Sequence, residues 1–409
     1  MTQNMPKWGV IAAQLAALLG VALLLGWVYG GWIGFSERFE PACAEPLCDW
    51  TRHYVPTAET ILQDPKPLWG YLYPPTLAIL IAPWAAAPWA SWAWGALLSL
   101  SIAALCVVPP HLLPNTRPRT SVMSTALAAM SIPLLQSLTW GQVSSLLLLL
   151  GLISLVLLRR TPWLSGIFLG VAIALKLYPA LWLPWLLRRR GWVATAVAVA
   201  VAVVLLAVLP VVVMGMGATF EFYQSVSSEI TRMVPGFRKS VGPQSVPSVL
   251  IRVVLGQNEL LRIPITVVSG LLGLAILGSL WWLPRWRPRD AAIWACVLAY
   301  ASFPFFLESA WLHYFVQLPL MWLLALRALD AGLERKLGVG VLLAVSVGLG
   351  TWPMWVAVGP AWFPAFGLIL LSHLSGLAAL YLVLFDPRSA VSEAGSLRHS
   401  MGGLDSPSR

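Results

Sequence analysis

The dominant pattern of this chain is a series of long apolar runs separated by short polar segments. Runs of about 20 residues, the length that crosses a ~30 Å hydrocarbon core, recur from the first residues to about residue 385. The first run, Trp8–Trp27, follows a single lysine and precedes no small-residue cleavage site with a soluble domain behind it. It therefore predicts an uncleaved membrane span and not a secretory signal.

Proline and polar residues divide the later runs. Residues 75–108 predict either one long bent helix or a pair of helices broken at Pro83 and Pro88. Residues 122–138 and 143–158 predict a hairpin of two short spans with "TWGQ" at its outer turn. Further spans are expected at residues 193–213, 263–283, 291–306, 315–329, 338–358 and 362–385.

One apolar run, residues 163–187, lies between two arginine clusters, at 159–160 and 188–190. Both clusters stay on the cytoplasmic face only if this run enters the membrane and returns as a re-entrant hairpin with "KLYP" near its tip. A single span that breaks the positive-inside rule once is the alternative. The hairpin is favoured because Pro179 and Pro184 would interrupt a straight helix.

Composition places the chain outside the soluble classes. Hydrophobic residues make up 59% of it and charged residues only 10%, whereas roughly a quarter of the residues of soluble domains are charged. We expect an all-α polytopic membrane protein with roughly 11 to 13 transmembrane or re-entrant helices. Residues 1–385 are expected to form one membrane domain, and the polar tail, residues 386–409, to be disordered and cytoplasmic.

Charge distribution gives the expected topology. The net charge of +10 comes from short basic clusters between apolar runs, which is typical of cytoplasmic loops and argues against a nucleic-acid partner. With the N-terminus inside, residues 30–73 and 217–260 become two outer loops, and the first holds six acids against three bases. Five polar stretches then meet at the outer face: the first loop, "TWGQ", "KLYP", the second loop and "ESAWLHY".

The abundance of arginine over lysine, 21 against 5 within the 26 basic residues, hints at a GC-rich bacterial genome. From the multi-span pattern and the loop charges we expect a multi-pass protein of the bacterial plasma membrane, with its functional site facing outward.

The stretch "CDWTRHY" in the first loop concentrates polar chemistry. Asp49 is either an N-cap of an amphipathic helix on the membrane surface or a general base whose pKa is raised by a partly apolar setting. If Asp49 is such a base, its neighbours Arg52, His53 and Tyr54 shape the binding site of the molecule that gives up the proton.

The four cysteines fall into two kinds. Cys43 and Cys48 flank the outer stretch and are free to pair if the loop faces an oxidising compartment. Cys106 and Cys296 lie inside apolar runs and are expected to be small buried hydrophobes.

Polar residues also mark the ends of several spans. Lys176 either snorkels to the interface or holds a phosphate at the outer face, and Gln142 and Tyr73 end or begin apolar runs nearby. The second loop offers hydrogen-bonding and basic groups for an anionic head group, or only solvated surface: Arg238, Lys239, Gln244 and Arg252. The last stretch contributes Trp311 and His313, and also Glu308, which would alternatively pair with an outer arginine.

Several reaction classes lack their motifs. The sequence contains no metal cluster of usable His/Cys/Asp spacing, no Walker loop, no dinucleotide fingerprint and no "GxSxG" elbow. No cofactor is expected, and one outer acid with several outer cations can supply a base and positive charge without a dedicated metal.

The order of the motifs resembles glycosyltransferase family 87, the polyprenyl-phosphate-dependent mannosyltransferase-like branch of the GT-C superfamily, over about residues 8–385. The matching elements are Asp49 with Tyr54, "YLYPP" at 71–75, Gly141 with Gln142, "GIFLGVAIALKLYP" at 166–179, "QSVPSVLIR" at 244–252, and Trp311 with His313. The chain departs from the family pattern at Ser144, Pro243 and Tyr314.

The resemblance implies a GT-C fold and the transfer of a hexose, most often mannose, from a polyprenyl-phosphate donor. The acceptor would be a lipid-linked or cell-envelope glycan, the transfer would be inverting, and both substrates would be reached from membrane lipid. Asp49 would be the base. Donor or phosphate contacts are assigned to Lys176, Arg238, Lys239, Arg252 and His313, and acceptor or sugar contacts to Arg52, His53, Tyr54, Tyr73, Gln142, Gln244, Glu308 and Trp311.

Two other classes of function fit part of the pattern. A transporter or flippase of a lipid-linked sugar or another anion also uses broken helices and outer cations, but the chain shows no convincing internal repeat. A catalytically silent relative would only bind an envelope glycolipid. Replacement of Asp49 separates the three, because only an enzyme loses turnover while it keeps the donor bound.

Overall fold

The structure is a computed structural model that describes residues 6–31, 34–35, 45–68, 70–189, 191–240, 242–254, 259–283, 290–307, 309–332, 335–359 and 362–386. Within these ranges the chain is helical and forms no β-strand. The helices of the first part are α1 (Lys7–Tyr29), η2 (Trp50–Tyr54), α3 (Val55–Thr60), α4 (Pro75–Ile81), α5 (Ala90–Val107), α6 (Pro109–Leu112), α7 (Pro118–Ala129), α8 (Ile132–Trp140) and α9 (Ser144–Leu157).

The middle of the chain continues the helical pattern. Its elements are α10 (Pro162–Leu175), η3 (Tyr178–Trp182), α11 (Leu183–Arg188), α12 (Trp192–Val203), η4 (Val204–Val208), α13 (Leu209–Met214), α14 (Met216–Lys239), α15 (Val246–Val249), η5 (Leu250–Val254), η6 (Glu259–Leu261) and α16 (Arg262–Ser279). The last part holds α18 (Ala291–Ser302), η7 (Phe303–Phe305), η8 (Leu312–Phe315), α19 (Leu318–Asp330), α20 (Lys336–Gly350), α21 (Trp352–Val358), α22 (Trp362–Ala365) and α23 (Leu368–Leu384).

The helices confirm the predicted class, an all-α polytopic membrane protein. Five helical segments in the described residues are long and apolar enough to cross a bilayer: Lys7–Tyr29, Ala90–Val107, Trp192–Met214, Arg262–Ser279 and Leu312–Asp330. A sixth forms if the bent pair α8 and α9 is one span. The first and third expose most of their apolar side chains, as expected of helices that face lipid, whereas the last is mostly buried inside the protein.

Breaks within the apolar runs follow local sequence. Residues 75–108 form the broken pair and not one long helix, because α4 ends at Ile81 and α5 begins at Ala90, with both prolines in the turns between them. Between α8 and α9 the chain bends by 116°. Gly141 ends α8 with a φ of 74°, in the left-handed region that glycine adopts at little cost.

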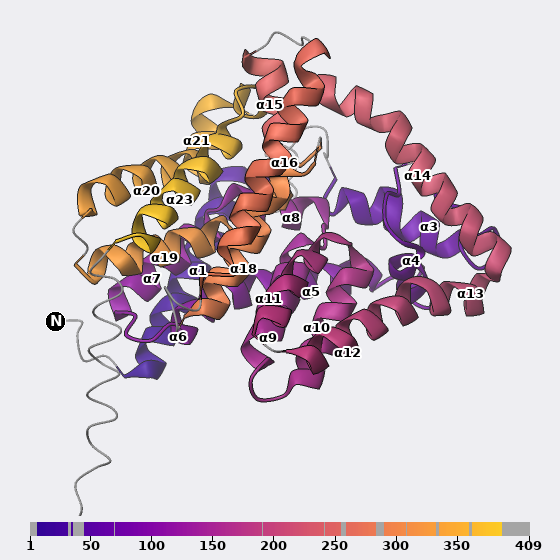
Figure 1. Cartoon of the computed structure of the whole chain (residues 1–409), viewed down its shortest axis with the longest axis horizontal. Helices are drawn as coiled ribbons and strands as arrows, with labels where there is room; N and C mark the ends of the chain where they lie inside the picture. Colours follow the sequence, from indigo (N-terminus) through magenta and orange to yellow (C-terminus); the bar gives the residue numbers. More distant parts are fainter. Residues whose placement is uncertain are drawn as a thin grey trace, which may run out of the picture.

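Residues 163–187 return on themselves, as the favoured prediction of a re-entrant hairpin requires. Helix α10 runs to Leu175, and η3 and α11 lead back. Arg159, before α10, and Arg189, after α11, line the same cavity, so both ends of the segment lie on one side of the molecule. Figure 1 shows α9, α10, α11 and α12 grouped together, away from α20 and α23.

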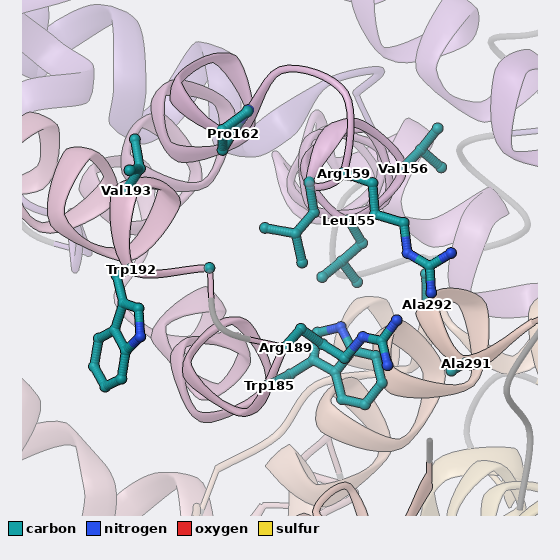
Figure 2. Close-up of a pocket in the computed structure, with 12 residues that line it drawn as sticks. Leu155, Val156, Arg159, Pro162, Trp185, Arg189, Trp192, Val193, Ala291 and Ala292 are labelled. Carbon is teal, nitrogen blue, oxygen red and sulfur yellow. The ribbon is translucent and has the colours of Figure 1, made fainter. Parts of the chain in front are cut away.

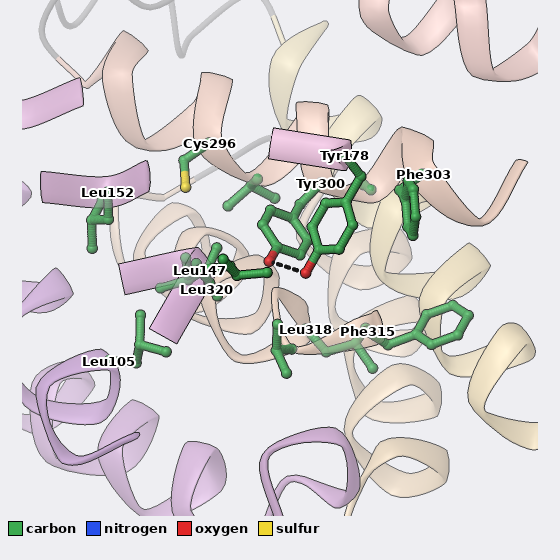
Figure 3. Packing of buried hydrophobic residues seen from close by; sticks show 14 of the residues in the cluster. Leu105, Leu147, Leu152, Tyr178, Cys296, Tyr300, Phe303, Phe315, Leu318 and Leu320 are labelled. Carbon is green, nitrogen blue, oxygen red and sulfur yellow. Dashed lines mark hydrogen bonds between the residues drawn. The ribbon is translucent and has the colours of Figure 1, made fainter. Parts of the chain in front are cut away.

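The interior is built around α18 and α19. Every residue of α18 except Ala292 is buried, and so are all residues of α19 from Leu318 to Leu326. Between these helices and the α10 hairpin, the hydroxyl groups of Tyr178 and Tyr300 form a hydrogen bond of 2.7 Å. Figure 3 shows this pair among apolar side chains such as Phe303 and Leu318. The core therefore holds the tip of the hairpin in place.

Helices α10 and α12 pack at very short range through two glycines. A Cβ atom on Gly166 would lie 2.5 Å from the carbonyl oxygen of Ala194, and one on Gly170 would lie 2.7 Å from that of Ala198. The spacing of four residues places both glycines on one face of α10, the small-residue pattern that lets membrane helices approach closely. This packing accounts for the two glycines of the "GIFLGVAIALKLYP" motif.

Replacing Gly170 with Ala is expected to destabilise the protein by about 1–3 kcal/mol, the usual cost of overpacking a tight interface. The measurement is the thermal unfolding midpoint of the purified protein in detergent. Gly340→Ala is the matched control, because no atom lies within 4 Å of a Cβ at that position. Equal midpoints for the two variants would contradict the close approach of α10 and α12.

Candidate functional site

Five separate segments of the chain line one cavity of about 230 Å³. The first loop, the "TWGQ" turn, the end of α10, helix α14 and the "ESAWLHY" stretch each contribute to it. Its lining residues are Asp49, His53, Gly70, Leu72, Tyr73, Trp140, Gln142, Lys176, Met233, Trp311, His313 and Tyr314. The five polar stretches therefore converge on one cavity, as predicted.

Asp49 enters the cavity from a buried segment. Its backbone is helical and its side chain caps no helix. The side chains of Trp50 and Tyr54 are fully buried, and the Trp50 ring stacks between Trp84 and Trp94 with centroid distances of 5.3 and 4.8 Å. The alternative of an N-capped helix that lies on the membrane surface is therefore wrong. Packing of the aromatic residues fixes the direction of the carboxylate.

Gln142 connects the polar groups of the cavity. Its Nε2 donates a hydrogen bond to the Asp49 carboxylate, and its Oε1 accepts one of 2.5 Å from the Tyr73 hydroxyl and a longer one of 3.4 Å from Tyr54. The turn before it is held by the indole N–H of Trp94, which donates to the carbonyl oxygen of Gly141 at 2.8 Å. The two tyrosine hydroxyls therefore hold the Gln142 amide in place, and the amide in turn orients the Asp49 carboxylate.

Lys176 does not snorkel to a surface. The backbone leaves α10 at this residue and becomes extended, with φ −160° and ψ 131°, which turns the side chain into the cavity. Its Nζ donates a hydrogen bond of 3.3 Å to the Tyr73 hydroxyl and lies 4.2 Å from the ring centroid of Tyr314 and 4.8 Å from that of Tyr73. The ammonium is thus held by aromatic faces and a hydroxyl.

Burial brings the pKa values of Asp49 and Lys176 together. Loss of solvation raises the pKa of Asp49 from 3.8 to about 7, against the opposing effects of Lys176, Gln142 and Arg52. Loss of solvation lowers the pKa of Lys176 from 10.5 to about 7, against the charge of Asp49. Both side chains are only partly exposed, and both line the cavity. A carboxylate and an ammonium that exchange protons near neutral pH suit acid–base chemistry.

The opposite wall is aromatic. The Trp140 ring lies 5.6 Å from that of Trp311 and 5.7 Å from the imidazole of His313. The backbone N–H of His313 donates to the side chain of Gln136 at 2.9 Å, while its Nδ1 is buried without a hydrogen-bond partner among the described residues. This wall therefore offers flat apolar faces and one imidazole nitrogen that is available to a ligand.

Sequence reasoning missed several lining residues. Trp140 and Tyr314 lie inside the motifs "TWGQ" and "ESAWLHY", and this position was the available signal that they belong to the site. Aromatic residues at the end of a span usually indicate membrane anchors, which is why they were missed. Gly70 contacts His53: a Cβ there would lie 2.4 Å from the imidazole. Met233 arrives on α14, in a segment expected to be a polar loop, and no local pattern identifies it.

Other expected site residues lie away from the cavity lining. Arg52 is exposed and pairs with Glu45 at 2.6 Å. The Arg252 guanidinium donates to the carbonyl oxygens of Ser240 and Pro364, both at 3.0 Å. Gln244 is buried and its Nε2 donates to the same Pro364 oxygen at 2.9 Å. These last two side chains connect backbone segments of the second loop and α22.

Three further predicted residues lie outside the described part of the structure. Glu308 is one of them, and the side chains of Arg238 and Lys239 are the others, although both positions belong to α14. Cys48 is disulfide-bonded, whereas Cys106 and Cys296 are free, buried thiols as expected. Cys43, the expected partner of Cys48, also lies outside the described residues. In the part of the chain that is described, no three His, Cys, Asp or Glu side chains gather as a metal site would require.

Comparison with known proteins shows to which enzyme family this membrane protein belongs. Residues 71–310, more than half of the chain, match glycosyltransferase family 87. The chain belongs to this family, as its motifs indicated. Asp49 and His313 lie outside the matched residues. No solved structure matches the chain.

Two curated relatives carry the same name, polyprenol-phosphate-mannose-dependent alpha-(1-2)-phosphatidylinositol mannoside mannosyltransferase. The protein from Mycolicibacterium smegmatis is 33% identical over 136 residues, which cover 29% of this chain and 31% of the relative. The protein from Mycobacterium tuberculosis is 28% identical over 263 residues, or 60% of this chain and 59% of the relative. The chain therefore spans 31% of the length of the first relative and 59% of that of the second.

Proposed function

We propose that this protein transfers a hexose, with mannose first in view of its relatives, from a polyprenyl-phosphate carrier to a lipid-linked glycan acceptor at the outer face of the membrane. The observation that carries the proposal is the cavity in which Asp49 and Lys176 meet, in a chain of glycosyltransferase family 87. The curated relatives are named for a phosphatidylinositol mannoside acceptor, and a glycolipid of that kind is the first acceptor to test.

Asp49 is proposed as the base. The acceptor hydroxyl gives its proton to the carboxylate while its oxygen forms the new bond to the sugar C1, on the side opposite to the departing phosphate. The transfer is then inverting. The raised pKa of about 7 makes Asp49 a stronger base than an exposed carboxylate and keeps it ionised in a useful fraction of molecules at neutral pH. Gln142 holds the carboxylate by its N–H and leaves the other oxygen for the acceptor.

Lys176 is proposed to bind the carrier phosphate. As the bond between C1 and the phosphate oxygen breaks, its electron pair and the resulting charge stay on the phosphate. A protonated ammonium beside that oxygen lowers the energy of the transition state, most strongly where water is excluded. Tyr73 and Tyr314 hold the Lys176 Nζ in the cavity at 3.3 Å from the Tyr73 hydroxyl, so little reorganisation is needed when the donor arrives.

The size and lining of the cavity suit a single sugar. Its volume of about 230 Å³ lies below the ~300–1,000 Å³ of pockets that enclose drug-sized ligands. The rings of Trp140 and Trp311 provide flat apolar faces for the C–H groups of a hexose. His313 Nδ1 can accept a hydrogen bond from a sugar hydroxyl. The lipid tails of donor and acceptor then remain in the bilayer.

The experiment that tests this function is incubation of the purified protein in detergent with radiolabelled polyprenyl-phosphate-mannose and a phosphatidylinositol mannoside. Label that appears in the acceptor, with the anomeric configuration opposite to that of the donor, supports an inverting transferase. A carrier that bears glucose is the matched comparison for the sugar. Movement of intact labelled donor across a liposome membrane, without a new glycosidic bond, would instead establish a flippase.

The orientation of the site has its own test. Arg52→Cys places a thiol on the exposed side of the first loop, whereas Arg160→Cys places one at the far end of α9, and both positions are exposed. A membrane-impermeant maleimide added to intact spheroplasts is expected to label the first variant and to label the second only after the membrane is opened. Labelling of residue 160 alone in intact cells would reverse the proposed topology.

A further inference from the structure

A second cavity lies at the opposite end of helices α9 and α10 from Gln142 and Lys176. It has a volume of about 470 Å³, and Figure 2 shows its lining. Helix α9 starts two residues after Gln142 and runs for 14 residues, so the two cavities are about 20 Å apart along its axis. We refer to the second cavity as the arginine pocket, after Arg159 and Arg189 in its wall. It belongs to no part of the proposed transfer reaction.

Two guanidinium groups share this pocket without an acid. Arg159 follows α9 and Arg189 follows α11, and the side chains extend toward one another beside Ala292 in Figure 2. Burial lowers the pKa of Arg189, and the positive charge of Arg159 and then of Arg188 lowers it further. Among the described residues neither Arg159 nor Arg189 forms an ion pair with a carboxylate. Arg189 is partly buried and Arg159 is exposed, and an anion between two like charges reduces their repulsion.

Helix ends of both kinds lie around the pocket: α9 and α11 end at its wall with a partial negative charge, and three further helices begin there. Three helices of at least 12 residues begin at its wall: α10 at Pro162, α12 at Trp192 and α18 at Ala291. Each N-terminus carries free N–H groups and a partial positive charge. Asp290, the residue before α18, is bound by Arg327 of α19 and does not line the pocket.

One buried donor points independently to a ligand. The indole of Trp185 is 1% exposed and lines the pocket, and its Nε1 has no hydrogen-bond partner among the described residues. A buried N–H without an acceptor costs about 1–3 kcal/mol, so such groups normally have a partner. The hydroxyl of Thr161, next to the lining residue Pro162, is also buried and has no hydrogen-bond partner in the described part of the chain. Donors and positive charges therefore gather at this pocket, and no carboxylate of the described residues lines it.

We propose that the arginine pocket is a binding site for a phosphate group. Arg159, Arg189 and the Trp185 indole supply the donors, since guanidinium groups match phosphate oxygens in charge and geometry. The phosphate belongs either to an anionic phospholipid of the surrounding bilayer or to free inorganic phosphate. The rim contains the exposed apolar side chains Trp192 and Val193, 65% and 55% exposed, along which acyl chains of a lipid would lie.

The test uses the full-length protein in a neutral detergent and three probes: dioleoyl phosphatidylglycerol, dioleoyl phosphatidylcholine and inorganic phosphate. Binding is measured by native mass spectrometry and by the shift of the unfolding midpoint with added probe. For the wild-type protein we expect tighter binding of phosphatidylglycerol than of phosphatidylcholine. Arg159→Gln/Arg189→Gln is expected to weaken that binding on the order of tenfold or more, because two charge-assisted hydrogen-bonding groups are lost.

Two further variants keep the test decisive. Arg160→Gln/Arg335→Gln removes the same charge at exposed positions outside the pocket, and it should bind phosphatidylglycerol as the wild type does. Trp185→Phe keeps the buried ring and removes only the N–H, so it should weaken binding about threefold to tenfold in a folded protein. If Arg159→Gln/Arg189→Gln fails to fold, Trp185→Phe still tests the proposal.

The outcomes separate the two sources of the phosphate. Selective loss of phosphatidylglycerol binding in the pocket variants establishes a lipid site. A midpoint shift with inorganic phosphate that these variants lose, without lipid selectivity, establishes a site for the free anion. Equal losses in the Arg160/Arg335 control, or wild-type affinity in both pocket variants, would overturn the proposal and leave only a general attraction of basic residues to anionic membranes.

Discussion

Asp49→Asn is expected to lower the rate of sugar transfer by about 10²–10⁴-fold, the range that a positioned general base contributes. Asparagine has the shape of aspartate and keeps an oxygen for the N–H of Gln142. It cannot, however, take up the proton of the substrate hydroxyl that attacks the sugar. The loss should therefore appear in kcat, while radiolabelled donor remains bound to the purified variant. Transfer and donor retention are measured on the same preparation.

Asp64→Asn is the matched control for this variant. Asp64 is an exposed acid of the same loop that pairs with Lys66 at 3.6 Å, so its loss should leave the rate unchanged. Wild-type transfer by Asp49→Asn would disprove the assigned base. If His313→Gln then abolished transfer, the base would be assigned to the imidazole of His313, which lines the same cavity.

The pH dependence of transfer should be a narrow bell centred near pH 7. The reaction requires ionised Asp49 and protonated Lys176, and the pKa of each group is about 7. Below this pH the carboxylate gains a proton and kcat/KM falls; above it the ammonium loses its proton and kcat/KM falls again. Because the two groups interact, the apparent pKa values on the two limbs belong to the pair.

Variants of Lys176 separate the two limbs. Lys176→Arg keeps a positive charge at all accessible pH values, so the alkaline limb should disappear while the acidic limb remains. Lys176→Met should lower kcat/KM by about 10²–10³-fold, as expected when a group that stabilises transition-state charge is removed. In that variant the acidic limb should move to higher pH, since the positive charge that lowers the pKa of Asp49 is gone.

Lys66→Met, at an exposed position, is the control for a change of net charge near the loop. An alkaline limb that persists in an active Lys176→Arg protein would show that another group controls it. A single titration in the wild type, without a second limb, would contradict the pairing of the two groups in the cavity.

Much of the fold was predictable because the bilayer imposes it. A span needs about 20 apolar residues and all of its backbone hydrogen bonds, so the runs near 8–27, 193–213 and 263–283 are visible as membrane helices in the sequence alone. The bends are less visible. The 116° turn between α8 and α9 depends on Gly141, whose carbonyl is held by Trp94 from a distant helix, and no local pattern encodes that contact.

The candidate site was predictable only in part, for a related reason. Polar residues at span ends, such as Asp49, Gln142 and Lys176, stand out against an apolar background, and they do meet. Arg252 and Gln244 look equally conspicuous, yet each donates a hydrogen bond to the carbonyl oxygen of Pro364. That partner lies more than a hundred residues away in the sequence. A side chain that supports a loop and one that binds a ligand thus have the same local signature.

The spread of the site along the chain also constrains its biosynthesis. Tyr314 leaves the ribosome about 265 residues after Asp49, which takes roughly 13 to 53 s at about 5–20 residues per second. During that interval the early polar groups lack their later partners. Because they lie at the ends of spans, outside the hydrophobic interior of each helix, they can remain hydrated while the following helices are inserted. A nascent chain that stops before the "ESAWLHY" stretch is therefore complete in most of its spans and still has no cavity.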